Sequence, residues 1–266
     1  MTYKLVAADL DDTLLRDDLT ISQETIDAMH QAVAQGVTVT IATGRSFPSA
    51  AKIAKQIGLN VPIITYQGAL IKNLLDEEVL YERTVPLESA RFLLDFCEKR
   101  NLHLQLYHGD ELYAAEDNDK IKNYVRLSKT PYIIGDLRQW IDIPQPKLLI
   151  VDQPEVCDQL REELLPLLGD NMHITKSKPH YLEFMHKEGT KGHAIEFLAQ
   201  HIGCSLDEVI ALGDAWNDRE MLEVAGLGVA MDNALPELKA LANYVTTSNN
   251  EDGVRHVIEK FILEKN

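Results

Sequence analysis

The sequence predicts an α/β protein in which a doubly wound core with a parallel sheet is interrupted by an inserted α+β domain. Short apolar strands alternate with amphipathic helices at both ends of the chain, and this alternation breaks down near residue 85 and resumes near residue 187. The chain has 266 residues, of which 45% are hydrophobic and 26% are charged. This composition is ordinary for a globular protein and excludes a disordered, collagen-like or fibrous chain.

The first part of the chain reads as strand, helix, strand, helix, strand. The opening apolar run suits a strand that is buried on both faces, and Thr20 and Gln23 have the spacing of a capping box for a helix that Gly36 ends. The remaining elements are a strand at residues 37–41, a helix at 48–58 and a strand at 61–66. This order predicts right-handed crossovers and a parallel sheet.

The middle of the chain has a different pattern. Residues 102–107 and 111–115 predict an antiparallel hairpin, and residues 172–176 and 181–185 predict another strand pair. Seven of the 10 prolines lie between residues 86 and 179. We therefore expect a discontinuous core of residues 1–84 and 187–266, with an inserted domain at residues 85–186.

The α/β alternation then resumes and completes the core. The expected helices lie at residues 191–202, 217–225, 235–242 and 251–263. The expected strands lie at residues 209–212, 228–231 and 244–246.

Charge and hydropathy exclude several classes of protein. Lys and Arg total 26 against 42 for Asp and Glu, which gives a net charge of −16. Such a surface repels nucleic acid and anionic membranes. No apolar run reaches the roughly 18–20 residues that span a bilayer, and the N-terminus lacks a signal-peptide pattern. The three cysteines are far apart and form no metal-binding motif. We expect a cytoplasmic protein without disulfides.

Polar side chains follow the strands at the points where each one ends. Asp9 and Asp11 come directly after the first strand, and Asp214 follows the strand at residues 209–212. In open α/β sheets, ligands bind beyond the carboxyl ends of the strands. Carboxylates brought together there need a cation, and Mg²⁺ prefers their oxygen atoms together with those of a substrate phosphate.

Two glycine-bearing turns and one lysine add to this edge of the sheet. Thr43-Gly44-Arg45 and Gln67-Gly68 follow the second and third strands, and backbone N–H groups of such turns can approach an anion. Lys191 begins a helix, where its charge opposes the helix dipole. This unfavourable position indicates that Lys191 has another role.

These segments resemble the four ordered motifs of the haloacid dehalogenase (HAD) superfamily of phosphotransferases. The matching segments are D-L-D-D-T-L at 9–14, T-G-R at 43–45, Lys191, and G-D-A-W-N-D at 213–218. The tail, with G-V-A-M-D-N-A at 228–234, is similar more narrowly to the Cof-type sugar phosphatases, which carry a large α/β cap of the C2 type. The resemblance implies a HAD-like Rossmannoid core and makes residues 85–186 the cap.

The resemblance also implies a covalent mechanism. Asp9 would be the nucleophile that forms an aspartyl-phosphate, and Asp11 would be the general acid and base. The carboxylates of Asp9 and Asp214 and the backbone carbonyl of Asp11 would bind Mg²⁺.

The resemblance assigns phosphate binding to a second set of groups. Thr43, the backbone N–H groups of Leu10 and Gly44, and Lys191 would contact phosphate oxygens, and Asn217 would contact the phosphate or order the metal site.

Four further residues are interpreted less specifically. Asp218 would support Lys191 or the waters on the metal, and Arg45 would reach the substrate or pair with a carboxylate of the core. Gln67 stands where many Cof-like chains carry Asn, and we leave its role open. Trp216 would be either a core residue or part of the mouth of the site.

The function expected from the sequence is hydrolysis of a small phosphorylated metabolite, most readily a sugar phosphate. A phosphomutase, in which a sugar hydroxyl replaces water, has the same motifs. A phosphoacceptor signalling module is a third alternative, but it needs neither Asp11 nor a large insert. Oligomeric state and the individual substrate stay open.

Overall fold

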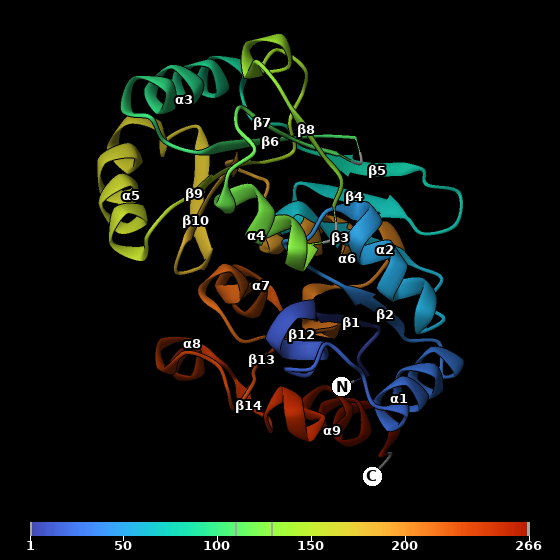
Figure 1. The fold of residues 1–266 in the computed structure, drawn as a ribbon. Coiled ribbons are helices and arrows are strands. Elements are labelled where there is room, and N and C mark those ends of the chain that lie inside the picture. Colours follow the sequence, from blue (N-terminus) through green and yellow to red (C-terminus); the bar gives the residue numbers. More distant parts are fainter. Residues whose placement is uncertain (1, 110, 129, 265–266) are drawn as a thin grey trace.

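The structure is a computed structural model that describes residues 2–109, 111–128 and 130–264. Figure 1 shows two layered parts, with the blue N-terminal and red C-terminal segments together in one part and the green and yellow middle of the chain in the other. No helix in the described ranges is both long and apolar enough to cross a membrane.

The first part is built on a five-stranded parallel sheet. Its order is β14-β13-β12-β1-β2, so strands from the two ends of the chain lie side by side. The strands are β1 (Leu5–Ala8), β2 (Thr38–Ile41), β12 (Val209–Gly213), β13 (Leu227–Ala230) and β14 (Tyr244–Val245). All four residues of β1 are buried and pair with both β12 and β2, as a strand covered on both faces requires.

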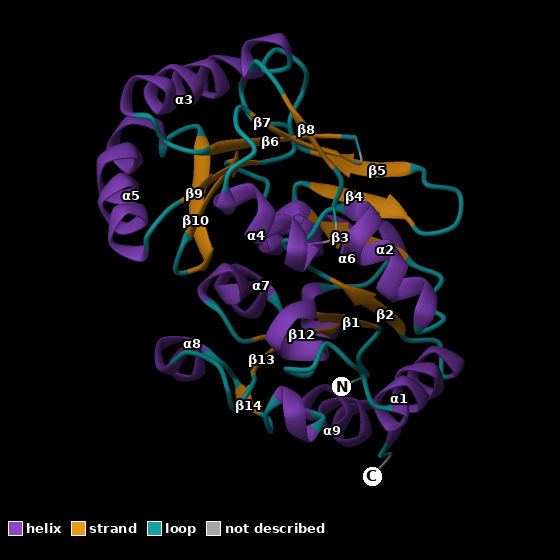
Figure 2. Ribbon diagram, in the orientation of Figure 1, coloured by secondary structure: helices purple, strands orange, loops and turns teal. Residues whose placement is uncertain are grey.

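Helices cover both faces of this sheet. The helices are α1 (Gln23–Ala34), α2 (Phe47–Gln56), α6 (Lys191–Ile202), α7 (Arg219–Val224), α8 (Pro236–Leu241) and α9 (Gly253–Ile258). In Figure 2, α1 and α9 lie on one side of the sheet, and α6 and α7 lie on the other. The doubly wound α/β core expected from the sequence is therefore confirmed.

The second part is a six-stranded sheet, in the order β10-β11-β9-β6-β7-β8. Its pairs are antiparallel except for β7 with β8. The strands are β6 (Leu104–His108), β7 (Glu111–Ala114), β8 (Tyr132–Ile134), β9 (Leu148–Val151), β10 (Met172–Lys178) and β11 (Tyr181–His186). The helices of this part are α3 (Leu87–Arg100), α4 (Asp119–Ser128) and α5 (Pro154–Leu168).

Alternating residues of this second sheet pack in two directions. Leu148 and Ile150 of β9 belong to a cluster with residues of α3 and α5, whereas Leu149 and Val151 belong to the cluster of the parallel-sheet core. A strand has this period of two because successive side chains point to opposite faces. One face of the sheet is thus turned toward the core. We propose that residues 85–186 form the cap, as the sequence predicts.

The third strand differs from the prediction. The sequence predicts β3 (Pro62–Thr65) in the parallel sheet, but only a single parallel bridge, from Ala42 to Ile64, and a hydrogen bond from Thr40 link it to β2. It pairs instead with β4 (Leu70–Asn73), which pairs with β5 (Val79–Glu82), in a separate antiparallel sheet.

A tight turn explains this pairing. Tyr66, Gln67 and Gly68 have φ of 50°, 62° and 103°, so the chain reverses directly after β3. Only glycine fits the third position, because a Cβ on Gly68 would lie 2.2 Å from the carbonyl oxygen of Thr190. The turn thereby packs against the start of α6.

The N-terminal cap of α1 also differs from the prediction. The sequence predicts a capping box at Thr20, but the hydroxyl of Ser22 accepts the hydrogen bond from the backbone N–H of Thr25, at 3.1 Å. Thr20 is exposed and donates to Asp18 instead. The hydrogen bond of Thr20 to Asp18 competes with a capping role for Thr20, and Ser22 is therefore the N-cap residue of α1.

This correction predicts unequal effects of two alanine substitutions. Ser22→Ala should lower the free energy of unfolding by about 1 kcal/mol, because it leaves an N–H at the start of α1 without its acceptor. Thr20→Ala should lower it by about 0.5 kcal/mol or less, as at an ordinary surface position. Urea unfolding of both variants measures the two free energies of unfolding. A larger decrease for Thr20→Ala than for Ser22→Ala would contradict the assignment of Ser22 as the N-cap residue.

Candidate active site

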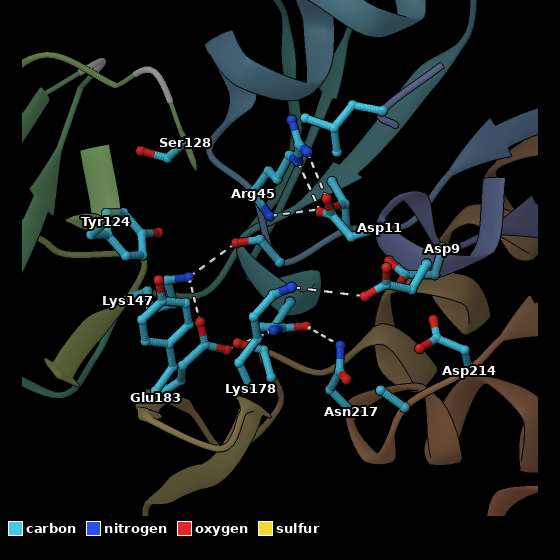
Figure 3. Close-up of a pocket in the computed structure, with 18 residues that line it drawn as sticks. Asp9, Asp11, Arg45, Tyr124, Ser128, Lys147, Lys178, Glu183, Asp214 and Asn217 are labelled. Atoms are coloured by element: carbon cyan, nitrogen blue, oxygen red, sulfur yellow. Dashed lines mark hydrogen bonds and ion pairs between the residues drawn. The ribbon is translucent and has the colours of Figure 1, made fainter. Parts of the chain in front are cut away.

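A cleft lies between the parallel sheet and the inserted domain. Its core side is formed by the ends of β1, β2 and β12 and by the turn after β3, and its other side by α4, β9, β10 and β11. Figure 3 shows Asp9 and Asp214 on one side of the cleft and Tyr124, Lys147 and Glu183 on the other. Of the predicted residues, the cleft wall includes Asp9, Asp11, Thr43, Gly44, Arg45, Asp214 and Asn217.

Three carboxylates meet at the ends of β1 and β12. One oxygen from each of Asp9, Asp214 and Asp218 lies within 4.8 Å of the others. Asp11, which the sequence analysis grouped with Asp9 and Asp214, is not among them because its carboxylate pairs elsewhere. The carboxylate of Asp218 belongs to this cluster and that of Asp11 does not, while a role of the Asp11 backbone carbonyl stays a prediction.

Lys191 holds this cluster together. Its ammonium lies 2.7 Å from Oδ1 of Asp9 and 2.5 Å from Oδ1 of Asp218, and its side chain is fully buried. Burial alone would lower the pKa of Lys191, but the charges of Asp218 and Asp9 raise it above its ordinary value. The ammonium therefore stays charged inside the protein.

The oxygens of the cluster are not equally occupied. Both oxygens of Asp218 are engaged, by Lys191 and by the backbone N–H groups of Asp214 and Ala215. Asp9 accepts from Lys191 and Asp214 accepts from Thr13, in each case through Oδ1. Among the described contacts, Oδ2 of Asp9 and Oδ2 of Asp214 accept no hydrogen bond. Both oxygens are therefore open to a ligand, and the cluster as a whole fits a divalent cation.

Burial and mutual repulsion raise the pKa of both remaining acids. Desolvation and the charge of Asp218 hold the pKa of Asp9 well above its usual range. The same two causes raise the pKa of Asp214 to about 7. A divalent cation would offset this repulsion and favour the ionised forms.

Asp11 pairs with Arg45. The guanidinium donates from Nε to Oδ2 at 2.8 Å and from Nη2 to Oδ1 at 2.6 Å, which is a bidentate contact. Of the two roles that the sequence left open for Arg45, the structure shows the pairing with a core carboxylate. This pair positions Asp11 on the cleft wall, beside Asp9.

The turn after β2 is fixed by a neighbouring side chain. Thr43 is buried and its hydroxyl accepts from the backbone N–H of Arg45. A Cβ on Gly44 would lie 2.4 Å from Nε2 of Gln67, so the side chain of Gln67 covers this glycine. A side chain at residue 44 would therefore displace the amide of Gln67 from this position.

Gln67 connects the two sides of the cleft. It accepts from Nδ2 of Asn217 at 3.0 Å and donates to Oε2 of Glu183 at 2.6 Å. The sequence left its role open, and the extra methylene relative to Asn extends its reach toward Glu183. The described side-chain hydrogen bond of Asn217 therefore goes to Gln67 and not to the acidic cluster.

Lys147 and Glu183 are site residues that the sequence analysis missed. Both are buried, and Lys147 donates to Oε1 of Glu183 at 2.8 Å and to the carbonyl oxygen of Gly44 at 2.9 Å. One signal was present, because Glu183 is an acid in the otherwise apolar stretch Tyr181–Met185 of β11. The sequence does not indicate its partner, because Lys147 lies 36 positions away in the chain.

Of the two alternatives for Trp216, the place in the core is wrong. Its side chain is 40% exposed, and the guanidinium of Arg219 lies 4.9 Å from the ring centroid. Asp218, two residues later, is fully buried because it turns inward to Lys191. Local hydrogen bonding of Asp218 fixes the turn and leaves Trp216 outside.

The raised pKa of Asp214 predicts how the metal-free protein responds to pH. The folded state holds this proton up to about pH 7, whereas the unfolded chain releases it near 3.8. The contribution of Asp214 to the free energy of unfolding therefore falls as pH rises between these two values. Asp214→Asn should remove this loss, so the variant should gain about 1–3 kcal/mol on the wild type between about pH 5 and pH 8.

Urea unfolding in excess chelator, repeated across this pH range, measures the difference between the two proteins. The matched control is Asp170→Asn, which removes the carboxylate of an exposed aspartate beyond the end of α5 and should follow the wild type. Parallel pH dependence of the wild type and Asp214→Asn would contradict the assigned shift.

Comparisons with known proteins agree with this geometry. A model of the haloacid dehalogenase-like hydrolase family matches residues 6–258. The chain is 31% identical to the 5-amino-6-(5-phospho-D-ribitylamino)uracil phosphatase YitU of Bacillus subtilis, over 97% of each chain.

Solved structures show the same fold. A haloacid dehalogenase-like hydrolase from Bacteroides thetaiotaomicron has a TM-score of 0.88 at 30% identity, covering 98% of this chain and 100% of that one. The HAD subclass IIB sugar phosphatase BT4131 has a TM-score of 0.86 at 26% identity, covering 97% and 98%. The chain therefore belongs to the haloacid dehalogenase-like hydrolase family, as one of its Cof-type phosphatases.

Proposed function

We propose that this protein is a Mg²⁺-dependent phosphatase of small phosphorylated metabolites, in particular sugar phosphates, and that it acts through a phosphorylated Asp9. One observation carries the proposal. The buried carboxylate of Asp9 lines the cleft with its Oδ2 without a hydrogen-bond partner among the described residues, while Lys191 holds Oδ1. This arrangement fits a nucleophile whose second oxygen faces a substrate.

The residues present fit Mg²⁺. Asp9 and Asp214 would hold it through their carboxylates and Asp11 through its backbone carbonyl, with Asp218 supporting Lys191. When bound, the ion supplies positive charge against the substrate phosphate and the carboxylates around it. Thr43, Lys191, Asn217 and the backbone N–H groups of Leu10 and Gly44 would orient the phosphate oxygens.

The reaction then has two displacements. A carboxylate oxygen of Asp9 bonds to phosphorus as the bond from phosphorus to the leaving oxygen breaks, and Asp11 gives that oxygen a proton. Asp11 next takes a proton from a water molecule, whose oxygen bonds to phosphorus and releases Asp9 and inorganic phosphate. Because Arg45 holds Asp11 in a bidentate ion pair, this pair has to loosen before Asp11 carries the proton.

Selectivity would come from the cap. The core residues provide for phosphate, metal and nucleophile, whereas the cap residues of the cleft face the rest of the substrate. The names of two relatives support a small metabolite as the substrate, since one is named for a ribitylaminouracil phosphate and the other for a sugar phosphate. A cap seated over the cleft would exclude bulk water and hinder a folded phosphoprotein.

The metal requirement is directly testable. Protein treated with chelator should lose hydrolysis of an aryl phosphate to background and regain it when Mg²⁺ is added, because the carboxylates cannot stay ionised beside a phosphate dianion without a cation. The control is the same protein carried through the treatment without chelator. Full turnover in excess chelator would exclude the proposed role of the metal.

The assignment of Asp11 makes a separate prediction. Asp11→Asn should lower kcat for a sugar phosphate by about 10²–10⁴-fold, because the leaving alkoxide then lacks its proton donor. An activated aryl phosphate, whose leaving group needs no proton, should lose much less in the first displacement, measured as the burst of released phenol. Equal losses of that burst and of sugar-phosphate turnover would count against this role.

A screen of phosphorylated metabolites tests the substrate class. We expect compact monophosphates to be hydrolysed and phosphoproteins to be left intact. Hydrolysis of phosphoproteins at a comparable kcat/KM would contradict the proposal.

A further inference from the structure

The cap side of the cleft contains an ion pair that the reaction described above does not use. Lys147 and Glu183 have side chains only 1% and 3% exposed, and their charged atoms lie 2.8 Å apart. The ammonium also lies 4.8 Å from the ring centroid of Tyr107. A buried pair of this kind costs desolvation energy and is weak evidence of a role in stability alone.

Both members of the pair also contact the core. Lys147 donates to the carbonyl oxygen of Gly44, beside the phosphate-binding Thr43, and Glu183 accepts from Gln67. Each charge thus has two partners, and the pair is fixed at the end of the cleft away from Asp9 and Asp214 (Figure 3). On the proposed mechanism this end of the cleft would receive the leaving group, because the transferred phosphate would lie beside Asp9.

The other cations of the cleft are paired as well. Arg45 pairs with Asp11, and Lys178 lies 3.7 Å from Asp12 across the cleft mouth. Within the described part of the chain, each Lys and Arg of the cleft wall therefore has a carboxylate partner. A second anionic group on a substrate would therefore meet a carboxylate beside each of these cations.

Uncharged hydrogen-bonding groups are available on the same side. Tyr124 accepts from the hydroxyl of Tyr107 at 2.6 Å, which leaves its own O–H hydrogen for another acceptor. Its hydroxyl points toward the middle of the cleft in Figure 3, and Ser128 and Ser177 also line the wall. These groups suit the hydroxyls of a neutral leaving group.

We propose that Glu183 is a specificity-determining residue that neutralises Lys147 and so restricts the enzyme to phosphomonoesters with an uncharged leaving group. This inference rests on the proposed phosphatase function. A substrate with a second phosphate or a carboxylate at that end meets Glu183 at close range, and like charges there are costly because water is excluded. Without Glu183, the same ammonium would become a receptor for the second anion.

The test compares a hexose monophosphate with the corresponding hexose bisphosphate, and the measured quantity is the ratio of the two kcat/KM values. The wild type should favour the monophosphate. Glu183→Gln keeps the shape and an acceptor for Gln67 but frees the charge of Lys147, so the ratio should shift toward the bisphosphate by about tenfold or more. Adding Lys147→Met to this variant should reverse the shift.

Two controls separate charge at the site from other effects. Glu163→Gln removes the charge of an exposed cap glutamate that pairs with Arg100, and it should leave the ratio unchanged. Turnover of an aryl phosphate, which has no second charge, reports that each variant is folded and keeps its core site.

The outcomes distinguish this inference from the proposed function. An unchanged ratio in Glu183→Gln with normal aryl phosphate turnover would overturn the inference, as would a shift caused by Lys178→Met and not by Glu183→Gln. A wild type that favours the bisphosphate would overturn it too. If the Mg²⁺-loaded wild type hydrolysed none of these phosphomonoesters, the proposed function would be wrong.

Discussion

The contact of the Lys191 ammonium with Asp9 and Asp218 is the interaction on which the site depends. It joins the end of β1, the start of α6 and the turn after β12, which are far apart in the sequence. Removing one partner from a buried ion pair costs about 3–5 kcal/mol, because the other charge stays unpaired. The arrangement therefore requires all three groups together, and it leaves one oxygen of Asp9 directed at the cleft.

A second set of contacts connects the core side of the site with the cap. Asn217 bonds to Gln67, Gln67 bonds to Glu183, and Glu183 pairs with Lys147. The set ends at the carbonyl oxygen of Gly44, in the turn that we propose binds phosphate. Buried hydrogen bonds thus connect the Lys147–Glu183 pair with the turn at Gly44 and with Asn217. The cap acts as part of the site and not only as its cover.

Local patterns predicted most of the core but not its long-range pairings. The strand-end acids Asp9 and Asp214 and the turn at Thr43 followed from the apolar runs that precede them, because parallel strands end at one edge of a sheet. Lys191 was indicated by its unfavourable position at the start of a helix. The antiparallel pairing of β3 depended on a turn with positive φ, which no glycine signalled at Tyr66 and Gln67. The pairing of Lys147 with Glu183 joins residues 36 positions apart, and a sequence pattern does not encode such a contact.

The central claim is that Asp9 carries the phosphoryl group during turnover. Wild-type protein mixed with Mg²⁺ and an aryl phosphate is quenched in acid, and its peptides are examined by mass spectrometry. The account predicts the added mass of one phosphoryl group on the peptide that contains Asp9, and its loss in Asp9→Asn. A phosphoryl group on another residue, or rapid turnover with no phosphorylated peptide after a quench that preserves acyl phosphates, would contradict it.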